Sequence, residues 1–249
     1  MSHDSNSLAR IEEDLGIACN ILEWESGDIF GHVGMRLPDG SGVACKAFRP
    51  ASITEPDWRV HFDWDAKKIR GTGGPPMEWP MYTEIFAARP DVQAIAHAHM
   101  PACIALSLVD VDIQPVHMQS AKFPKPIPTY PRPIHIKDRE EGQALAQALG
   151  GAKAVMIKGH GVVSVGRTID EACMNNMYME RTAKIMGLAR TLGFQTTEPG
   201  FVEEMIGSRA ALTGAHNDEY RRSRGGYTNE WLYYKNRIAR GERWTRGWS

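Results

Sequence analysis

Residues 154–166 of the chain read Ala-Val-Met-Ile-Lys-Gly-His-Gly-Val-Val-Ser-Val-Gly. Two apolar, largely β-branched runs, Ala154–Ile157 and Val162–Val165, flank the turn Lys158-Gly159-His160-Gly161. Short apolar runs bounded by glycine are typical of buried strands. The stretch therefore predicts two neighbouring strands joined by a tight turn, which can present the His160 side chain into a cleft.

The segments on either side of this hairpin predict an α/β fold. Val92–His99 has the composition of another buried strand. Proline in the first turn, and Asp or Thr followed three residues later by Glu, are signals that open a helix. On these signals, helices are expected at residues 80–89, 101–109, 138–149 and 168–192. Strands that alternate with helices indicate a central sheet with helices around it.

The two ends of the chain carry weaker signals. A first amphipathic helix is expected from Leu8 to about Ala18, and two strands, Gly34–Leu37 and Gly42–Phe48, are expected around the Pro-Asp-Gly turn at 38–40. The segment 220–249 is aromatic and basic, with no clear period. No linker or repeat divides the chain, so we expect a single domain over residues 1–249.

The composition excludes several classes of function. The 249 residues are 42% hydrophobic, enough for a sizeable core, and the formal charge of −1 gives no electrostatic footprint for nucleic acid or an anionic membrane. No stretch approaches the about 20 apolar residues of a membrane span. Four scattered cysteines without a CxxC pair are expected to be reduced thiols in a cytoplasmic protein.

The pattern His97-Ala98-His99 is the first candidate for chemistry. Side chains alternate along a strand, so residues two apart share a face, and a metal ion can use both imidazoles as neutral donors. Chance placement of two of the nine histidines is the alternative. His160 at its glycine turn makes a set of three, which favours a catalytic metal site over a turn histidine that caps a carbonyl.

Glu78 is the candidate acid–base group. It precedes the helix expected at residue 80 and stands beside Trp79 and Pro80. A carboxylate among apolar rings loses hydration, which is expected to raise its pKa toward a working value. A first-turn glutamate without a function is the alternative. His32 and His117 are candidates for binding the acid group of a substrate, or else buried histidines with ordinary partners; His61 and His135 have no supporting context.

These residues together resemble the class II aldolase/adducin family. The resemblance covers about Leu8 to Leu192. It rests on five stretches that follow one another in the chain: Glu78-Trp79, Ala88-Arg89-Pro90-Asp91-Val92, His97-Ala98-His99, Gly159-His160-Gly161-Val162-Val163-Ser164-Val165-Gly166, and Asp170-Glu171-Ala172 with Met179-Glu180-Arg181. It implies a three-layer α/β/α fold with a mainly antiparallel sheet. It also implies one divalent metal per subunit, usually zinc, held by His97, His99 and His160, with Glu78 as the acid/base, in a homotetramer with sites between subunits.

Departures from the family pattern bear on the substrate. Sugar-phosphate members hold phosphate with a Gly-Asn-Val-Ser type loop and a pair of serines before the glutamate, where this chain has Gly31-His32-Val33-Gly34 and Pro76-Met77. Proline lacks a backbone N–H to donate. The loop Gly31-His32-Val33, together with the stretches Glu84–Asp91 and Pro115-Val116-His117-Met118, looks more like the decarboxylase-type branch, whose members act on aromatic or muconate-derived hydroxy and oxo acids.

We therefore expect a metal-dependent lyase that decarboxylates an unphosphorylated acid of that kind through a metal-stabilised enolate. Aldol cleavage of an unphosphorylated hydroxy-oxo acid and a non-catalytic, adducin-like module are the alternatives. Manganese, cobalt or magnesium could replace zinc. Tyr227, in the aromatic C-terminal segment, is a further candidate for lining the site, or else packs at an interface.

Overall fold

The described residues of the chain build one eight-stranded sheet. The computed structural model describes residues 8–47, 58–71, 73–109, 111, 113–123, 126–212 and 226–243. Its strands are β1 (His32–Arg36), β2 (Gly42–Lys46), β3 (Arg59–Asp63), β4 (Lys68–Arg70), β5 (Ala94–Ala98), β6 (Thr129–Tyr130), β7 (Ala154–Ile157) and β8 (Gly161–Gly166). They lie in the order β4-β3-β2-β1-β5-β8-β7-β6, and every pair is antiparallel except β6–β7. The expected α/β class and mainly antiparallel sheet are confirmed.

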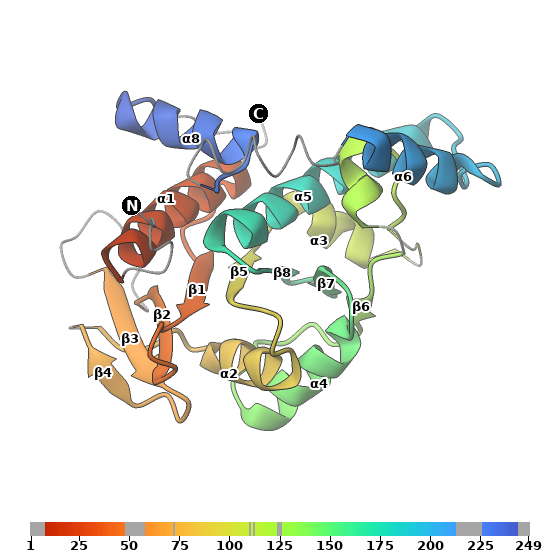
Figure 1. Cartoon of the computed structure of the whole chain (residues 1–249). Helices are drawn as coiled ribbons and strands as arrows, with labels where there is room; N and C mark the ends of the chain where they lie inside the picture. Colours follow the sequence, from red (N-terminus) through yellow and green to blue (C-terminus); the bar gives the residue numbers. More distant parts are fainter. Residues whose placement is uncertain are drawn as a thin grey trace.

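Helices lie against both faces of this sheet. The described helices are α1 (Leu8–Ser26), α2 (Trp79–Ala88), α3 (Pro101–Ser107), the 3-10 helix η2 (Met118–Lys122), α4 (Arg139–Leu149), α5 (Ile169–Thr191), α6 (Phe201–Leu212) and α8 (Asn229–Ala239). Figure 1 shows α2 and α4 below the sheet, and α1, α3 and α5 above it. The buried residues correspondingly divide into one cluster with α1, α3 and α5 and another with α2 and α4.

Strand β5 lies at the centre of the sheet, and its alternating side chains feed both clusters. Ala94, Ala96 and Ala98 belong to the cluster with α1 and α5, whereas Ile95 belongs to the cluster with α2. Side chains two residues apart share a face, so His97 points toward the side of the sheet where α2 begins. The period-two pattern thus aims a histidine at the N-terminus of α2.

Helix boundaries follow the capping signals closely. The Asp138 side chain accepts a hydrogen bond from the backbone N–H of Glu141, and the Glu141 carboxylate accepts one in return from the N–H of Lys137. Thr168 and Glu171 cap α5 in the same way. The expected N-cap residues Asp138 and Thr168 are confirmed, but each glutamate accepts from the N–H of the residue before the N-cap and not from that of the N-cap itself, as a capping box requires. The four cysteines are free and buried, as expected for reduced thiols.

The C-terminal segment is more regular than its sequence predicts. The sequence shows no clear period in 220–249 and predicts no helix there, but α8 lies within this segment. It begins after the N-cap Thr228 and buries Trp231 completely. Most residues of α8 contact solvent, so its apolar face is narrow. Trp231 is its buried residue, and the partly buried Tyr234 and Ile238 pack against the same cluster, so that α8 contacts α1 and α5. Residues 220–225 and 244–249 of this segment, and Phe48 of the expected second strand, lie outside the described residues.

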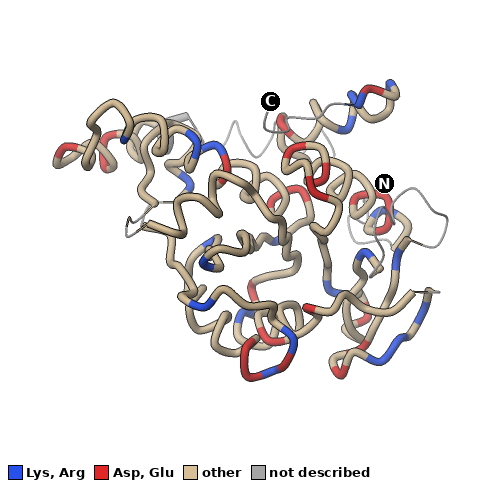
Figure 2. The backbone as a smooth tube through the Cα atoms, turned by 180° about the vertical axis from the view of Figure 1, so that it is seen from behind, with Lys and Arg blue, Asp and Glu red and all other residues tan. Residues whose placement is uncertain are grey.

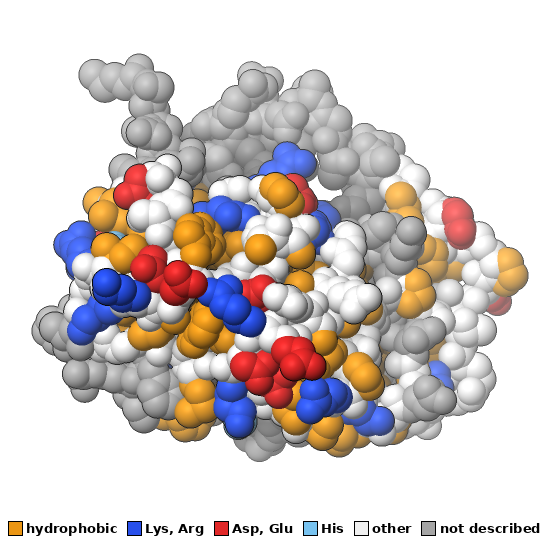
Figure 3. All heavy atoms as spheres, turned by 90° about the horizontal axis from the view of Figure 1, so that it is seen from below, with side chains coloured by type: hydrophobic (Ala, Val, Ile, Leu, Met, Phe, Trp, Pro, Cys, Tyr) orange, Lys and Arg blue, Asp and Glu red, His pale blue; other side chains and the backbone are white. Residues whose placement is uncertain are grey.

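Charges of both signs are interspersed over the molecule. Short acidic and basic segments are scattered along the otherwise uncharged tube in Figure 2, and the face seen from below in Figure 3 carries both signs side by side without a continuous block of either. None of the described helices is long and apolar enough to cross a bilayer.

A close approach of two helices gives a test of this packing. A Cβ atom added at Gly142 on α4 would lie 2.8 Å from the carbonyl oxygen of Pro80 and 2.7 Å from Cγ of Glu84, both on α2. Gly142→Ala is therefore expected to lower the free energy of unfolding by about 1–3 kcal/mol through overpacking. Gly187→Ala on α5 is the control, because nothing lies within 4 Å of its added Cβ; it should stabilise the protein by about 0.5–1 kcal/mol. Urea unfolding curves measure both, and a Gly142→Ala protein as stable as wild type would contradict the packing.

Candidate metal and acid–base centre

Three strands bring the first histidines together. His97 on β5 pairs directly with His32 on β1 and with Val163 on β8, and the ring centroids of His32 and His97 are 5.1 Å apart. His99 follows the end of β5, with its ring centroid 5.1 Å from that of His97. Cross-strand neighbours and residues two apart thus gather three imidazoles near the middle of the sheet, where β1 begins and β5 ends.

The turn between β7 and β8 delivers His160 to the same place. Its backbone N–H donates to the carbonyl of Ile157 at 3.0 Å, and Gly159 adopts a φ of 65° that favours glycine. A Cβ atom at Gly161 would lie 2.6 Å from the carbonyl oxygen of Ala98. The two glycines therefore let the turn pass close to the end of β5, where the His160 ring lies 5.0 Å from the rings of both His97 and His99.

One ring nitrogen of each of these three histidines is held by an acceptor. Nδ1 of His97 lies 3.1 Å from the carbonyl oxygen of Val162, Nδ1 of His160 lies 2.9 Å from that of Ile134, and Nδ1 of His99 hydrogen-bonds the Asp28 carboxylate. A nitrogen that faces an acceptor must carry the proton. Each Nδ1 is therefore N–H, which leaves a lone pair on Nε2 of each ring in its neutral form.

Those three lone pairs converge. Candidate ligand atoms of His97, His99 and His160 all lie within 4.8 Å of one another, and Nε2 of His99 faces Nε2 of His160 at 3.1 Å. Nε2 of His97 is fully buried and has no hydrogen-bond partner in the part of the chain that the structure describes. Burial lowers the pKa of His97 and His160, which favours their neutral, metal-binding form. A divalent cation satisfies such a set of donors, and these residues fit one.

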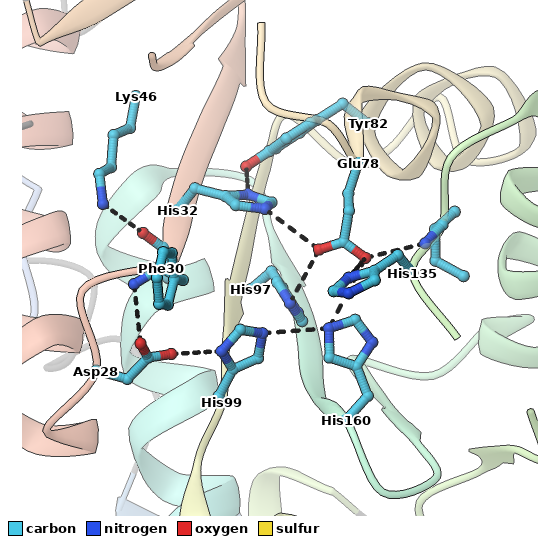
Figure 4. A network of polar contacts seen from close by, with 12 residues as sticks. Asp28, Phe30, His32, Lys46, Glu78, Tyr82, His97, His99, His135 and His160 are labelled. Carbon is cyan, nitrogen blue, oxygen red and sulfur yellow. Dashed lines mark hydrogen bonds and ion pairs between the residues drawn. The ribbon is translucent and has the colours of Figure 1, made fainter. Parts of the chain in front are cut away.

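Glu78 lies at the N-cap of α2 and faces the histidines (Figure 4). Its Oε2 is 3.5 Å from Nε2 of His97, its Oε1 is 3.8 Å from Nε2 of His160, and Oε1 also accepts the backbone N–H of Ile136 at 2.9 Å. The apolar surroundings expected from Trp79 and Pro80 are wrong. Burial does favour a raised pKa, but the N–H of His32 that faces Oε2 and the neighbouring imidazoles of His97 and His160 lower the pKa of Glu78 below its ordinary value.

His32 connects Glu78 to the interior. Burial raises the pKa of the Tyr82 hydroxyl well above its ordinary value, so this hydroxyl keeps its proton and donates to Nδ1 of His32 at 2.5 Å. Nε2 of His32 then carries the proton and faces Oε2 of Glu78 at 3.8 Å. A Cβ atom at Gly34 would lie 2.5 Å from the Tyr82 ring, so glycine on β1 makes the room that this arrangement needs.

Residues 22–186 match the family described as "Class II Aldolase and Adducin N-terminal domain". The chain belongs to the class II aldolase and adducin family. A 3,4-dihydroxyphthalate decarboxylase of Arthrobacter keyseri is 26% identical over 193 residues, which span 70% of this chain and 77% of that protein. An L-fuculose phosphate aldolase of Escherichia coli (strain K12) is 28% identical over 170 residues, 68% of this chain and 77% of that protein.

Solved structures agree on the family fold. An L-fuculose 1-phosphate aldolase from Glaciozyma antarctica PI12 superposes with a TM-score of 0.73 at 20% identity, over 96% of this chain and 92% of that one. The two curated relatives described above are a decarboxylase and an aldolase, and both kinds of enzyme are carbon–carbon lyases, the class that the sequence predicts for this family member.

Two residues of the centre have no signal in the sequence. His135 was assigned no role, yet its Nδ1 lies 3.8 Å from Oε1 of Glu78 and its ring lies 5.2 Å from that of His160. Asp28 is 71 residues from His99 in the chain and yet binds its Nδ1. Neither residue belongs to a spacing or a motif, and only the approach of distant loops, which a single sequence does not reveal, brings them in.

The other predicted substrate-binding residues have partners elsewhere in the subunit. The His117 ring contacts Gln119 at 2.9 Å and the Thr182 hydroxyl at 3.0 Å. The Tyr227 hydroxyl lies 2.7 Å from the Asp14 carboxylate and accepts from Arg10. Within one subunit, neither belongs to the histidine cluster, so their predicted role stays a prediction that requires a neighbouring subunit.

The hydrogen bond to Asp28 is expected to orient the His99 ring for metal binding, and this can be tested. Burial tends to raise the pKa of Asp28, but hydrogen bonds from His99 and from the backbone N–H of Phe30 lower it, so the carboxylate is ionised beside the imidazole. We expect Asp28→Asn to weaken zinc binding about 10–100-fold, as outer-shell changes do. Competition with a chromophoric chelator measures this. Asp39→Asn, at an exposed turn, is the control, and equal affinities for both variants would contradict a role of Asp28 in orienting His99.

Proposed function

We propose that this protein is a divalent-metal-dependent lyase that decarboxylates an unphosphorylated aromatic or muconate-type hydroxy or oxo acid. The observation that carries the proposal is the convergence of three Nε2 lone pairs beside the Glu78 carboxylate, because these groups repel one another unless a cation lies between them. We take His97, His99 and His160 as its ligands and zinc as the expected ion, one per subunit, with manganese, cobalt or magnesium as substitutes.

The chemistry that such an ion supplies is electrophilic: it polarises substrate oxygens and takes up negative charge that develops on them. Glu78 supplies the proton transfer. Its lowered pKa keeps it ionised before substrate binds, so Oε2 can accept the proton of a substrate hydroxyl group. For an aromatic acid, Glu78 then gives this proton to the ring carbon that carries the departing carboxylate, and when the bond to that carboxylate breaks and CO2 leaves, its electron pair returns to the ring. For an oxo acid, the electron pair of that bond enters the oxo system as CO2 leaves, and Glu78 then gives the proton to the carbon.

The surroundings of Glu78 suit this role. The backbone N–H of Ile136 fixes Oε1, and His32 holds an N–H toward Oε2 because Tyr82 donates to its other nitrogen. Glu78 and His32 are each only 7% exposed, which limits the access of bulk water to the transferred proton. His32 is therefore proposed to orient the acid group of the substrate together with Glu78.

Two features support an unphosphorylated substrate. The Asp28 carboxylate lies in the loop before β1 and adds negative charge beside His99. Lys46, the cation nearest to this loop in the described contacts, directs its ammonium group at the carbonyls of Ile29 and Gly31 and not at the histidines. A phosphate dianion would meet a carboxylate at this position, whereas the sequence departures at Gly34 and Pro76 remove side-chain and backbone donors.

The relatives support decarboxylation as the first reaction to test. Several curated relatives of 26–28% identity are 3,4-dihydroxyphthalate decarboxylases. The fuculose phosphate aldolases among the relatives support the second candidate, aldol cleavage of an unphosphorylated hydroxy-oxo acid. A single domain over residues 1–249, a cytoplasmic homotetramer and a role for His117 and Tyr227 at sites between subunits complete the proposal.

Incubation of the zinc-loaded protein with 3,4-dihydroxyphthalate and with a panel of hydroxy-oxo acids tests the proposal. We expect CO2 to be released from the aromatic acid. Release of an aldehyde from a hydroxy-oxo acid, without CO2, would assign the protein to the aldolases. A protein that takes up no metal and releases neither product would be a non-catalytic, adducin-like module.

A further inference from the structure

The exposure of the clustered side chains shows where the centre opens to solvent. The side chain of His97 is fully buried, and those of His32, Glu78 and His160 are each 9% exposed. The side chains of His99 and His135 are 24% and 63% exposed. Nδ1 of His99 already forms a hydrogen bond with Asp28. A molecule that enters from solvent therefore meets the exposed His135 ring, which has no such bond among the described residues.

The backbone on either side of His135 is fastened to the centre. The carbonyl oxygen of Ile134 accepts from Nδ1 of His160, and the backbone N–H of Ile136 donates to Oε1 of Glu78, both at 2.9 Å. His135 therefore stands at a fixed point between the proposed metal ligand and the proposed acid–base group, as Figure 4 shows.

The His135 ring has no hydrogen bond within the described residues. Its closest polar contact is the distance of 3.8 Å from Nδ1 to Oε1 of Glu78, which is too long for a hydrogen bond. Its ring meets the His160 ring edge to face, with centroids 5.2 Å apart. An imidazole fixed by its backbone, with an unused N–H at the entrance, is prepared to donate to a ligand.

The chemistry around the cluster indicates which ligand group this is. In the described part of the chain, no lysine or arginine forms an ion pair or hydrogen bond with His32, Glu78, His97, His99, His135 or His160. An anionic group of the substrate that enters beside the cluster, away from the proposed metal, therefore meets the imidazole N–H of His135 and not a cation paired with these residues. A carboxylate of the substrate can be bound by such an N–H donor, because a hydrogen bond to an ionised group is stronger than one between two neutral groups.

We propose that His135 is a substrate-binding residue that donates a hydrogen bond to a carboxylate which the substrate keeps through the reaction. The inference rests on the proposed function and narrows it: the substrate is an aromatic diacid, of which one carboxylate leaves beside Glu78 and the other is held by His135 at the entrance. His135 would select diacids over monoacids without binding the metal.

Two ligands that differ by one carboxylate test this inference. Catechol and 3,4-dihydroxybenzoate share the pair of neighbouring hydroxyl groups, and only the second carries a carboxylate, which lies away from them. Calorimetry with the zinc-loaded protein is expected to show about tenfold tighter binding of 3,4-dihydroxybenzoate, and His135→Ala should abolish this preference while leaving the affinity for catechol unchanged.

Two further variants make the test specific. His135→Gln keeps an N–H donor and should restore most of the preference. Lys137→Ala removes an exposed cation from the same loop and should leave the preference intact. The zinc content of all variants should stay at one ion per chain.

Each other outcome overturns the inference. A preference that survives in His135→Ala, or is lost equally in Lys137→Ala, means that another group or the general charge of the loop binds the carboxylate. A loss of zinc in His135→Ala means that this histidine is a ligand of the metal. If neither compound binds the wild-type protein with zinc bound, the proposed function fails together with the inference.

Discussion

His97→Ala is expected to remove divalent-metal binding, with a loss of affinity well beyond the about 10–100-fold that outer-shell changes cost. His97 is the member of the set that is fully buried, and its Nε2 has no hydrogen-bond partner among the described residues. The substitution leaves only the imidazoles of His99 and His160 as ligands, and the His99 side chain is more exposed to solvent than that of His160. Metal content per chain after equilibration with zinc and removal of free ion measures the effect.

A matched control separates the loss of a ligand from the loss of a buried ring. His61 is also buried, on β3, where its Nε2 lies 3.3 Å from the Glu12 carboxylate and away from the histidine cluster. His61→Ala should lower stability, as His97→Ala does, but should keep full metal content. His160→Ala is a second ligand variant at a less buried position. Full zinc occupancy in both ligand variants would contradict the assignment of the site.

Glu78→Gln is expected to lower kcat by about 10²–10⁴-fold, the range for loss of a general acid–base group. Glutamine keeps the shape and accepts the Ile136 N–H, but it neither takes up nor returns a proton at Oε2. The rate of CO2 release at saturating zinc and substrate measures the effect. Metal content is determined on the same samples, because Glu78 faces the proposed ligands.

Glu84→Gln provides the control for Glu78→Gln. Glu84 lies on the same helix and is equally buried, and its carboxylate pairs with Arg139 at 2.6 Å and with Gln143 at 3.1 Å. Breaking this pair should lower the melting temperature and leave kcat near the wild-type value. A Glu78→Gln enzyme within tenfold of wild type, with full metal content, would remove Glu78 from the acid–base role.

The positions of the metal-binding candidates follow from short-range regularities of the chain. The alternation of side chains on a strand is enough to place His97 and His99 together, and two glycines are enough to turn His160 toward them. Glu78 was likewise predicted just before a helix, since Pro80 marks the first turn. Each of these inferences depends on neighbours within a few residues.

The surroundings of those residues could not be predicted, because they come from distant parts of the chain. Ile136 is 58 residues from Glu78, and Tyr82 is 50 residues from His32. The expected rise in the pKa of Glu78 was wrong for this reason: the sequence shows Trp79 and Pro80 beside it, but the fold surrounds its carboxylate with imidazoles. The short strands β3, β4 and β6 and the helix α8, whose buried side is narrow, lack a pattern strong enough to predict.

Anomalous diffraction from crystals of the zinc-loaded protein, recorded on both sides of the zinc absorption edge, tests the central claim most directly. The account predicts one peak per subunit, about 2.0–2.1 Å from Nε2 of each of His97, His99 and His160. A peak bound by other residues, or no peak within reach of these three nitrogens in protein that carries zinc, would contradict it.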